Sequence, residues 1–421
     1  MLKVLTAALA VILTVALFWP GYMSVDSLVQ LEQARYGIRD SGHPPLLSLI
    51  WRVVDKILPG PGGMLALQAG LYWSGVAMLA PSAPWMAAGL LPPLFGMTGV
   101  VWKDVWMCVS LLAAVGCLAS AWPKAGLVLL LAASGFRHNG IAAVIPLLWP
   151  AAAALARPRR RTWSCFLVLS AGFIAASHWL THPPGVPDPK LWRLVMAHDL
   201  AGMSLRENRD LFPPGFLARH GLTLESLRRI YVPYQMDPTF SLQFRHVFGI
   251  EADEKQRLDQ SLIDADEMRR VWLTTVLRHP LLWAGRRLEI ASRVLVWNRE
   301  EAWSPVHVGI PANALGVSWR PDWRSRWLEK NLNHLARQTP LYQVWIYCLI
   351  LLAAAILFRR HALIAATAWS GLLSAAVVCA VAGSTDYRYM LWTVAAALAV
   401  CLLAAGEWRR AYRQSSSSSQ S

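Results

Sequence analysis

The sequence predicts an all-α polytopic membrane protein with about ten spans and a mainly helical soluble region inserted late in the chain. Of its 421 residues, 55% are hydrophobic and the mean hydropathy is +0.37, which is more apolar than an ordinary soluble domain. Apolar runs that approach the roughly 20 residues of a membrane-spanning helix recur along the chain. The 22 Trp residues fit a protein with many membrane–water interfaces, where amphipathic rings collect.

The apolar runs predict spans in this order: 3–19, 64–80, 84–102, 105–122, 124–136, 139–156, 163–180, 341–358, 362–382 and 389–406. Several are shorter than a perpendicular span requires, so the number of spans is ten to within about one. The stretch 124–156 is either two short helices broken at Gly135–Gly140 or one long helix with a kink.

The first run resembles a secretory signal sequence, because Lys3 precedes an apolar segment from Val4 to Trp19. Bulky Phe18-Trp19-Pro20 stands where a cleavage site needs small residues. We therefore expect an uncleaved first span.

Clusters of basic residues fall on one side of the membrane when the spans are counted. They are Arg157 with Arg159, Arg160 and Arg161, then Arg359-Arg360-His361, then Arg409, Arg410 and Arg413, joined by Lys3 and Lys124. Because cytoplasmic loops carry the excess of Lys and Arg, this side is predicted to be the cytoplasm. The expected organisation is a membrane domain 1–180, a soluble region 181–340, spans within 341–408, and a disordered cytoplasmic tail 409–421.

The unusual polar clusters fall on the opposite, extracytoplasmic side. These are the loop 20–63, Lys103-Asp104, Arg137-His138-Asn139, the region 181–340 and the loop Gly383–Tyr389. This shared sidedness is the main functional signal. It predicts one site in which Asp26, Asp104 and Arg388 line a common cavity.

The region 181–340 has helix signals and only weak strand signals. Asp264 followed by Glu267 is typical of a capped helix start, and Pro280 is expected to end or kink that helix after Arg278. Residues 281–297 have the pattern of an interfacial amphipathic helix, and 322–337 is another helix candidate. No repeat, Gly-rich phosphate loop or nucleophile elbow is present in the sequence.

Each polar cluster allows a structural and a functional interpretation, because a charge in the bilayer centre costs about 2.5–3.5 kcal/mol and persists where it meets water, a partner or a site. Asp26 is either an N-cap or surface acid of a helix from about Val25 to Tyr36, or a general base above an acceptor hydroxyl. His43 either begins the helix that starts at Pro44-Pro45 or belongs to the site.

The later clusters allow the same choice. Lys103-Asp104 either forms an ion pair that joins two helix ends, or Lys103 binds phosphate while Asp104 helps to bind the acceptor or a metal. Arg137, His138 and Asn139 present the same alternatives. Asp386 and Arg388 open the last span, where Arg388 either snorkels to the interface or binds phosphate with two nitrogens.

Composition limits the other function classes. The net charge of +15 suggests nucleic-acid binding, but the Arg clusters lie between apolar segments and fit topology signals and anionic-lipid contacts better. No nucleic-acid partner is therefore expected. The six Cys all lie in or beside apolar runs without metal-ligand spacing, so neither a metal site nor a disulfide framework is predicted from them.

The order of the motifs resembles the GT-C class of polytopic membrane glycosyltransferases, which includes protein O-mannosyltransferases and lipid A aminoarabinose transferases. The resemblance begins with a first span, then Asp26 in a Gly- and Ser-containing loop, then His43-Pro44-Pro45 before the next helix. It continues with Lys103-Asp104, Arg137-His138-Asn139 and Asp386–Tyr389, and it covers the whole topology. It is closest to bacterial members of largely undefined specificity. Many members pair two acids in the first loop, whereas here Ser27 follows Asp26.

The resemblance implies an enzyme of the bacterial inner membrane that moves a sugar from a polyprenyl-phosphate carrier to a periplasmic envelope glycan, lipid or protein. Asp26 would be the base, with Asp104 and His43 also catalytic. Lys103, Arg137, His138, Asn139, Asp386 and Arg388 would bind substrate. No cofactor is required, and a divalent cation stays an open alternative. The rival interpretations are a transporter or flippase of lipid-linked sugars, which would place charges near the midplane and show repeats, and another lipid-using transferase.

Overall fold

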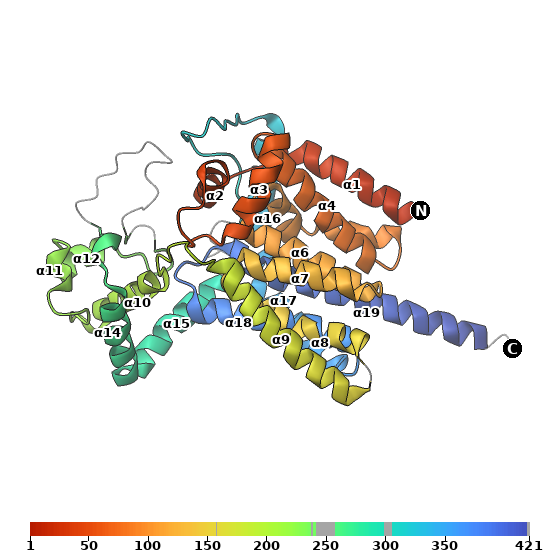
Figure 1. Cartoon of the computed structure of the whole chain (residues 1–421). Helices are drawn as coiled ribbons and strands as arrows, with labels where there is room; N and C mark the ends of the chain where they lie inside the picture. The colour runs from red at the N-terminus through yellow and green to blue at the C-terminus, as the bar shows by residue number, and fades with distance from the viewer. Residues whose placement is uncertain (157, 237–238, 241–256, 299–304, 419–421) are drawn as a thin grey trace.

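The computed structural model describes residues 1–156, 158–236, 239–240, 257–298 and 305–418, and these form helices joined by loops (Figure 1). Three isolated β-bridges are the only sheet-type pairings in these residues. The N-terminal half contains α1 (Leu2–Phe18), α2 (Val25–Tyr36), α3 (Pro45–Ile57), α4 (Gly62–Leu79), η1 (Ala83–Leu90), α5 (Pro92–Phe95), η2 (Gly96–Gly99), α6 (Lys103–Ala119), α7 (Pro123–Phe136), α8 (Gly140–Leu155) and α9 (Arg159–Thr181).

The remaining helices form the late region and the C-terminal part of the bundle. They are α10 (Trp192–Glu207), α11 (Phe216–Arg219), α12 (Leu224–Ile230), η3 (Gln260–Leu262), α14 (Ala265–Arg278), α15 (Pro280–Val294), α16 (Trp323–Gln338), η5 (Pro340–Tyr342), α17 (Val344–Leu357), α18 (Ala362–Val381), η6 (Tyr387–Met390) and α19 (Leu391–Ser418). The all-helical fold class is confirmed for the described part of the chain.

Three segments are long and apolar enough to cross a membrane, by length and composition: α9, α18 and the stretch Tyr387–Ser415. The apolar helices α1, α7, α8 and α17 have only 14–17 residues. At 1.5 Å per residue they are about 21–26 Å long, less than the roughly 30 Å hydrocarbon core. Association with a membrane is thereby supported, and the arrangement of ten spans stays a prediction.

One predicted span is wrong. Residues 84–102 do not form a helix of membrane length but the short elements η1, α5 and η2, followed by an extended stretch to α6. Pro84, Pro92 and Pro93 each remove a backbone donor, so apolar composition here does not produce a continuous helix. The stretch 124–156 is two helices, α7 and α8, separated by Arg137–Asn139, and the single kinked helix is excluded.

The centre of the bundle is formed by α6 and the first part of α19, residues 391–403, whose side chains are mostly buried. Helices that are apolar on all sides belong in such a position. At Gly75 of α4, a Cβ atom would lie 2.9 Å from the backbone nitrogen of Ala113 in α6. A side chain there would push the two helices apart, so glycine is needed for their close approach.

The helix boundaries expected in 181–340 are confirmed. The Asp264 side chain caps α14 by accepting a hydrogen bond from the Glu267 backbone N–H, and α14 ends at Arg278 before α15 begins at Pro280. Asp322 likewise caps α16. The region contains two parts. Residues between Leu194 and Trp272 share a hydrophobic core of their own, whereas α15, α16 and the segment 305–319 pack against the membrane bundle.

The two ends of the bundle differ. Both termini lie at one end, and helices α10–α14 of the late region extend from the other (Figure 1). The expected disordered tail 409–421 is wrong as far as Ser418, because α19 continues to that residue, and residues 419–421 lie outside the described part. Once a long helix is formed, each further residue adds a backbone hydrogen bond at little cost. Arg157 of the basic clusters also lies outside the described residues.

Candidate functional site

The predicted site residues come from five separate places in the sequence and lie together at the end of the bundle away from the termini. Asp26 is in the first turn of α2, and His43 precedes α3. Lys103 and Asp104 begin α6, while Arg137, His138 and Asn139 connect α7 to α8. Asp386 and Arg388 precede α19. These residues therefore lie at helix starts or in turns between helices, as the sequence indicated.

Asp26 forms the centre of the first group of contacts. Its Oδ2 lies 2.7 Å from Nη1 of Arg388, whose Nη2 lies 3.1 Å from Oδ2 of Asp386. One guanidinium therefore bridges two carboxylates. Burial by itself raises the pKa of Asp26, but the charge and hydrogen bond of Arg388, together with His43 and Lys103, outweigh burial, and the pKa lies well below its usual range. The N-cap of α2 is Ser24, so the interpretation of Asp26 as an N-cap is excluded.

His43 connects Asp26 to Lys103. The Lys103 ammonium lies 2.8 Å from His43 Nδ1, and His43 Nε2 lies 3.9 Å from Asp26 Oδ1. Burial, aided by the charge of Lys103, lowers the pKa of His43 to about 3, so the ring is neutral at pH 7. An ammonium has only donors, so Nδ1 accepts and the ring proton is assigned to Nε2, which faces Asp26. The α3 helix begins at Pro45 with Pro44 as its N-cap, so His43 precedes the cap and does not itself begin the helix, and its role in a site stays a prediction.

Asp104 and Arg137 form a direct ion pair between the start of α6 and the end of α7. This agrees with the structural interpretation, in which charges join helix ends. Asp104 is 1% exposed, and its Oδ2 has no hydrogen-bond partner among the described residues. Arg137 also lies 4.7 Å from the Tyr389 ring centroid, and Arg388 lies 5.4 Å from the same ring. Tyr389 therefore joins the two groups of contacts into one network.

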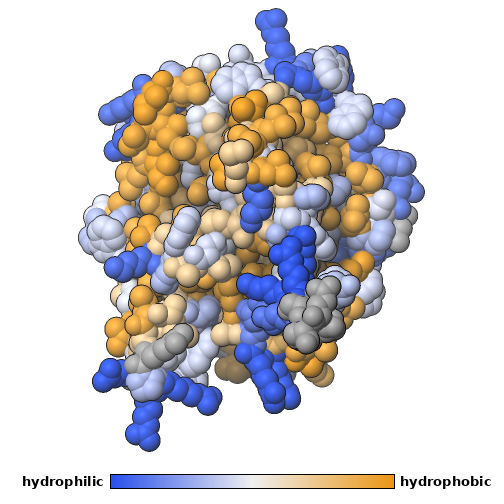
Figure 2. Space-filling model, turned by 90° about the vertical axis from the view of Figure 1, so that its right-hand side faces the viewer, coloured by the Kyte–Doolittle hydropathy of each residue, from blue (hydrophilic) through white to orange (hydrophobic). Residues whose placement is uncertain are grey.

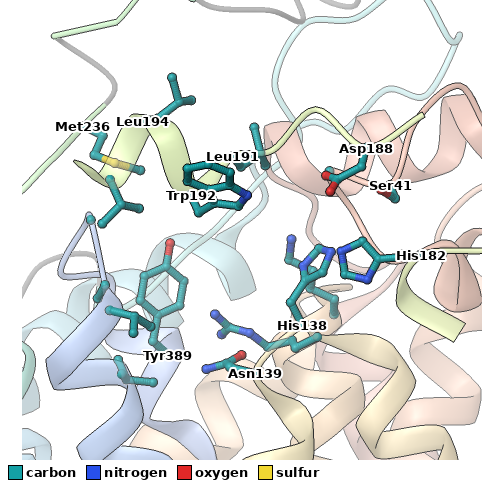
Figure 3. Close-up of a pocket in the computed structure, with 18 residues that line it drawn as sticks. Ser41, His138, Asn139, His182, Asp188, Leu191, Trp192, Leu194, Met236 and Tyr389 are labelled. Carbon is teal, nitrogen blue, oxygen red and sulfur yellow. The ribbon is translucent and has the colours of Figure 1, made fainter. Parts of the chain in front are cut away.

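A cavity of about 510 Å³ opens beside this network (Figure 3). Its polar side includes Lys103, Arg137, His138 and Asn139. Its apolar side comes from α10 and α18 and includes Leu191, Trp192, Leu194, Val195, Val378 and Val381. Asp26, Asp104 and Arg388 do not line it but lie behind Lys103 and Arg137, so the expectation that all three face one cavity is wrong. Their mutual proximity holds, and the cavity itself presents cations next to an apolar wall.

The sequence reasoning missed several cavity residues. His182 is one: its ring lies 4.9 Å from that of His138, and the two stand side by side in Figure 3, across the cavity from Tyr389 and Met236. Asp188, Ser41 and Trp192 also line the cavity. His182 follows a predicted span and precedes Pro183, the same pattern that identified His43 before Pro44. The sequence therefore contained a pattern by which His182 could have been identified as a candidate site residue.

His307 was missed without any comparable signal. Its ring lies 5.1 Å from that of Trp102, which in turn stacks on Arg388 at 4.7 Å, and its Nε2 lies 2.9 Å from the Met23 carbonyl oxygen. The late segment 305–319 therefore covers the loop between α1 and α2, and Met23 N–H donates to the Gly309 carbonyl at 2.9 Å. Contacts separated by more than 280 residues are invisible in sequence patterns.

The late region also positions the loop that carries Arg388. The Thr385 N–H donates to the Tyr234 carbonyl at 3.0 Å, and a Cβ on Gly383 would collide with Met236. Arg287 of α15 donates to the Ala382 carbonyl at 2.8 Å and forms an ion pair with buried Asp199. The loop 382–388 is thus anchored by residues of the region 181–340.

Arg287→Met is expected to lower the free energy of unfolding by about 3–5 kcal/mol, because it leaves the buried carboxylate of Asp199 without its cation. Chemical denaturation of the purified protein measures this. The matched control is Arg278→Met on exposed α14 surface, expected to change stability by less than about 0.5 kcal/mol. Equal stability of the two variants would show that the Arg287–Asp199 pair is not a significant anchor.

In the part of the chain that the structure describes, no group of three or more His, Cys, Asp or Glu side chains is arranged to hold a metal ion. The interpretation of Asp104 as a metal ligand therefore gains no support from its neighbours, of which Arg137 is the closest charged group.

Comparison with models of known families, with curated proteins and with solved structures gives no match for this chain.

Proposed function

We propose that this chain is a membrane glycosyltransferase that moves a sugar from a polyprenyl-phosphate carrier to an acceptor hydroxyl of the cell envelope. The observation that carries the proposal is the connected network of Asp26, His43, Lys103 and Arg388, with the pair Asp104–Arg137, beside a cavity that joins cations to an apolar wall. A lipid phosphate has the matching chemistry, an anion on an apolar chain. In this proposal the site faces the periplasm and the bundle lies in the bacterial inner membrane with about ten spans.

The proposed reaction is a displacement at the anomeric carbon. The acceptor oxygen forms a bond to that carbon as the bond from the carbon to the phosphate oxygen breaks. The acceptor reaches Asp26 from outside the cavity lining, where its side chain is 26% exposed, and the acceptor proton passes to the Asp26 carboxylate and then to water. The polyprenyl phosphate leaves with one more negative charge than the donor phosphodiester had, and Lys103 and Arg137 on the cavity wall stabilise that charge.

The pairing of Asp26 with Arg388 makes Asp26 a weak base in the free protein. A bound phosphodiester brings negative charge next to Lys103 and Arg137, which opposes the cations that depress the pKa of Asp26. Donor binding is therefore expected to make Asp26 more basic. This would delay proton transfer until the donor is present.

The decisive test measures bond cleavage. The purified, reconstituted protein is given a polyprenyl-phosphate sugar, and free polyprenyl phosphate and glycosylated acceptor are quantified by mass spectrometry. Envelope glycans from a deletion strain identify the acceptor. Recovery of the intact donor on the opposite side of the vesicle, with no cleavage, would instead establish the rival function of a transporter or flippase.

Donor binding is expected to weaken above pH 8. Burial lowers the pKa of Lys103 to about 8, with Arg137 and Arg388 adding to the effect and Asp26 opposing it. Lys103 is thus charged below this pH and loses its charge as the pH rises through it, so KM for the donor should rise by up to about tenfold per pH unit. Lys103→Arg keeps a charged side chain at all these values and should give a flat KM. The same alkaline rise in both proteins would remove Lys103 as the titrating group.

A further inference from the structure

A second pocket lies at the end of the molecule that carries the termini, far from the candidate site. It has a volume of about 280 Å³ and is formed by the start of α1, the end of α4, Ala119 of α6 and the last part of α19. Figure 2 looks onto this end and shows hydrophilic residues around and between hydrophobic ones. The basic lining residues are Lys3, Arg409, Arg410 and Arg413.

We call this the basic pocket, because all the charged residues that line it are cations. Its lining includes no acidic residue. Glu407, the neighbouring acid on α19, forms ion pairs with Arg410 and with His361. Arg409 and Arg413 lie one helical turn apart on the same helix and both line the pocket.

Lys3 makes the electrostatic environment of the pocket favourable for an anion. The carbonyl groups at the C-terminal end of α4 carry partial negative charge and would repel one. The Lys3 ammonium donates to the carbonyls of Ala77 at 2.9 Å and Ala80 at 3.1 Å, and so covers this end of the helix. An ammonium has three protons, so one remains for a ligand.

The same pocket has an apolar side, made by Met78, Leu79, Pro81, Leu402 and Leu403. Cations that only snorkel from a helix end do not need such a wall. A pocket between bundle helices that combines cations with apolar side chains matches an amphiphile at the membrane surface.

We propose that this basic pocket binds the headgroup of an anionic phospholipid of the cytoplasmic leaflet, with the phosphate between Lys3, Arg409 and Arg413 and the glycerol and first acyl carbons against Leu402 and Leu403. The site is separate from the candidate active site and does not depend on the proposed transferase activity. Its occupant would fasten α1 and α4 to α19 where these helices reach the membrane surface.

The test is native mass spectrometry of the full-length protein in detergent, supplied with equal amounts of phosphatidylglycerol and phosphatidylethanolamine. The wild-type protein should retain phosphatidylglycerol preferentially. The double variant Arg409→Gln/Arg413→Gln should bind it about 30-fold more weakly, from about fivefold for each surface arginine. The charge-matched control Arg159→Gln/Arg160→Gln removes two basic residues of another cluster at the start of α9, outside the pocket, and should retain the lipid as the wild type does.

Three other results would each contradict the proposed lipid site. Equal loss in the two double variants would mean that general surface charge attracts the lipid, and the proposed pocket would be wrong. Absence of preference between the two lipids in the wild type would overturn it as well. Competition with excess inorganic phosphate tests whether the pocket recognises the whole lipid or only a phosphate group. If inorganic phosphate displaces phosphatidylglycerol fully, the pocket binds phosphate alone, and the apolar wall has no part in recognition.

Discussion

Asp26→Asn is expected to lower sugar transfer by about 10³-fold while the protein still inserts and folds. A general base contributes about 10²–10⁴-fold, and the amide of asparagine cannot take the acceptor proton. The substitution preserves the shape of a side chain that is 26% exposed, so the local packing at the start of α2 should persist. The measurement is release of polyprenyl phosphate under single-turnover conditions, with thermal unfolding recorded for the same sample.

The matched control for this result is Glu32→Gln, on the same helix. Glu32 lies on the same helix as Asp26 and pairs with the exposed Arg39 at 3.1 Å. It tests whether loss of any carboxylate from α2 disables the protein, and it should transfer sugar at close to the wild-type rate. Full transfer by a well-folded Asp26→Asn protein would remove the assignment of the base, although it would leave the rest of the proposed function intact.

Arg388→Lys is expected to lower kcat/KM by about 10²-fold, although the charge is retained. The guanidinium reaches Asp26 with one nitrogen and Asp386 with the other, and it stacks on the rings of Trp102 and Tyr389. A single ammonium cannot make both contacts in the same plane. Loss of one partner in a buried charge pair costs about 2–5 kcal/mol. If about 3 kcal/mol of this cost is lost from the stabilisation of the transition state, kcat/KM falls by about 10²-fold.

Arg39→Lys provides the conservative control, because Arg39 is 56% exposed on its side chain and lies between α2, which carries Asp26, and α3. It should be within about twofold of the wild type. If Arg388→Lys behaved in the same way, the bridge between the two carboxylates would have no role in transfer. Arg388→Met should additionally reduce the free energy of unfolding by up to about 3 kcal/mol, since two partly buried carboxylates would lose the cation that they share.

The clustering of the candidate site residues at one end of the bundle was predictable, and the pairing among them was not. Helix starts at Val25, Pro45, Ala265 and Trp323 follow from caps and prolines that precede them, because these interactions are local. The partners within the site are long-range. Nothing local indicates that Arg137 pairs with Asp104 rather than with a phosphate, or that Arg388 chooses Asp26 and Asp386.

The span at 84–102 shows where composition misleads. Hydropathy measures how well a segment tolerates an apolar environment, and this segment is indeed buried at many positions. It does not measure whether the backbone can form uninterrupted hydrogen bonds, which three prolines prevent. The segment is instead held by tertiary contacts, such as the Gln68 side chain that donates to the carbonyls of Thr98 and Val100.

By itself, the sequence determined that this protein is helical and rich in apolar segments, and that its distinctive polar groups gather at one end, since periodicity, proline placement and charge distribution are local properties of a chain. Only the tertiary structure decided which of those groups touch and which of them reach the cavity. It also showed that a segment near residue 307 covers a loop near residue 23. Contacts of this kind depend on how helices that are distant in the sequence pack together. Packing is determined by the shapes of whole helix surfaces rather than by neighbouring residues in the sequence.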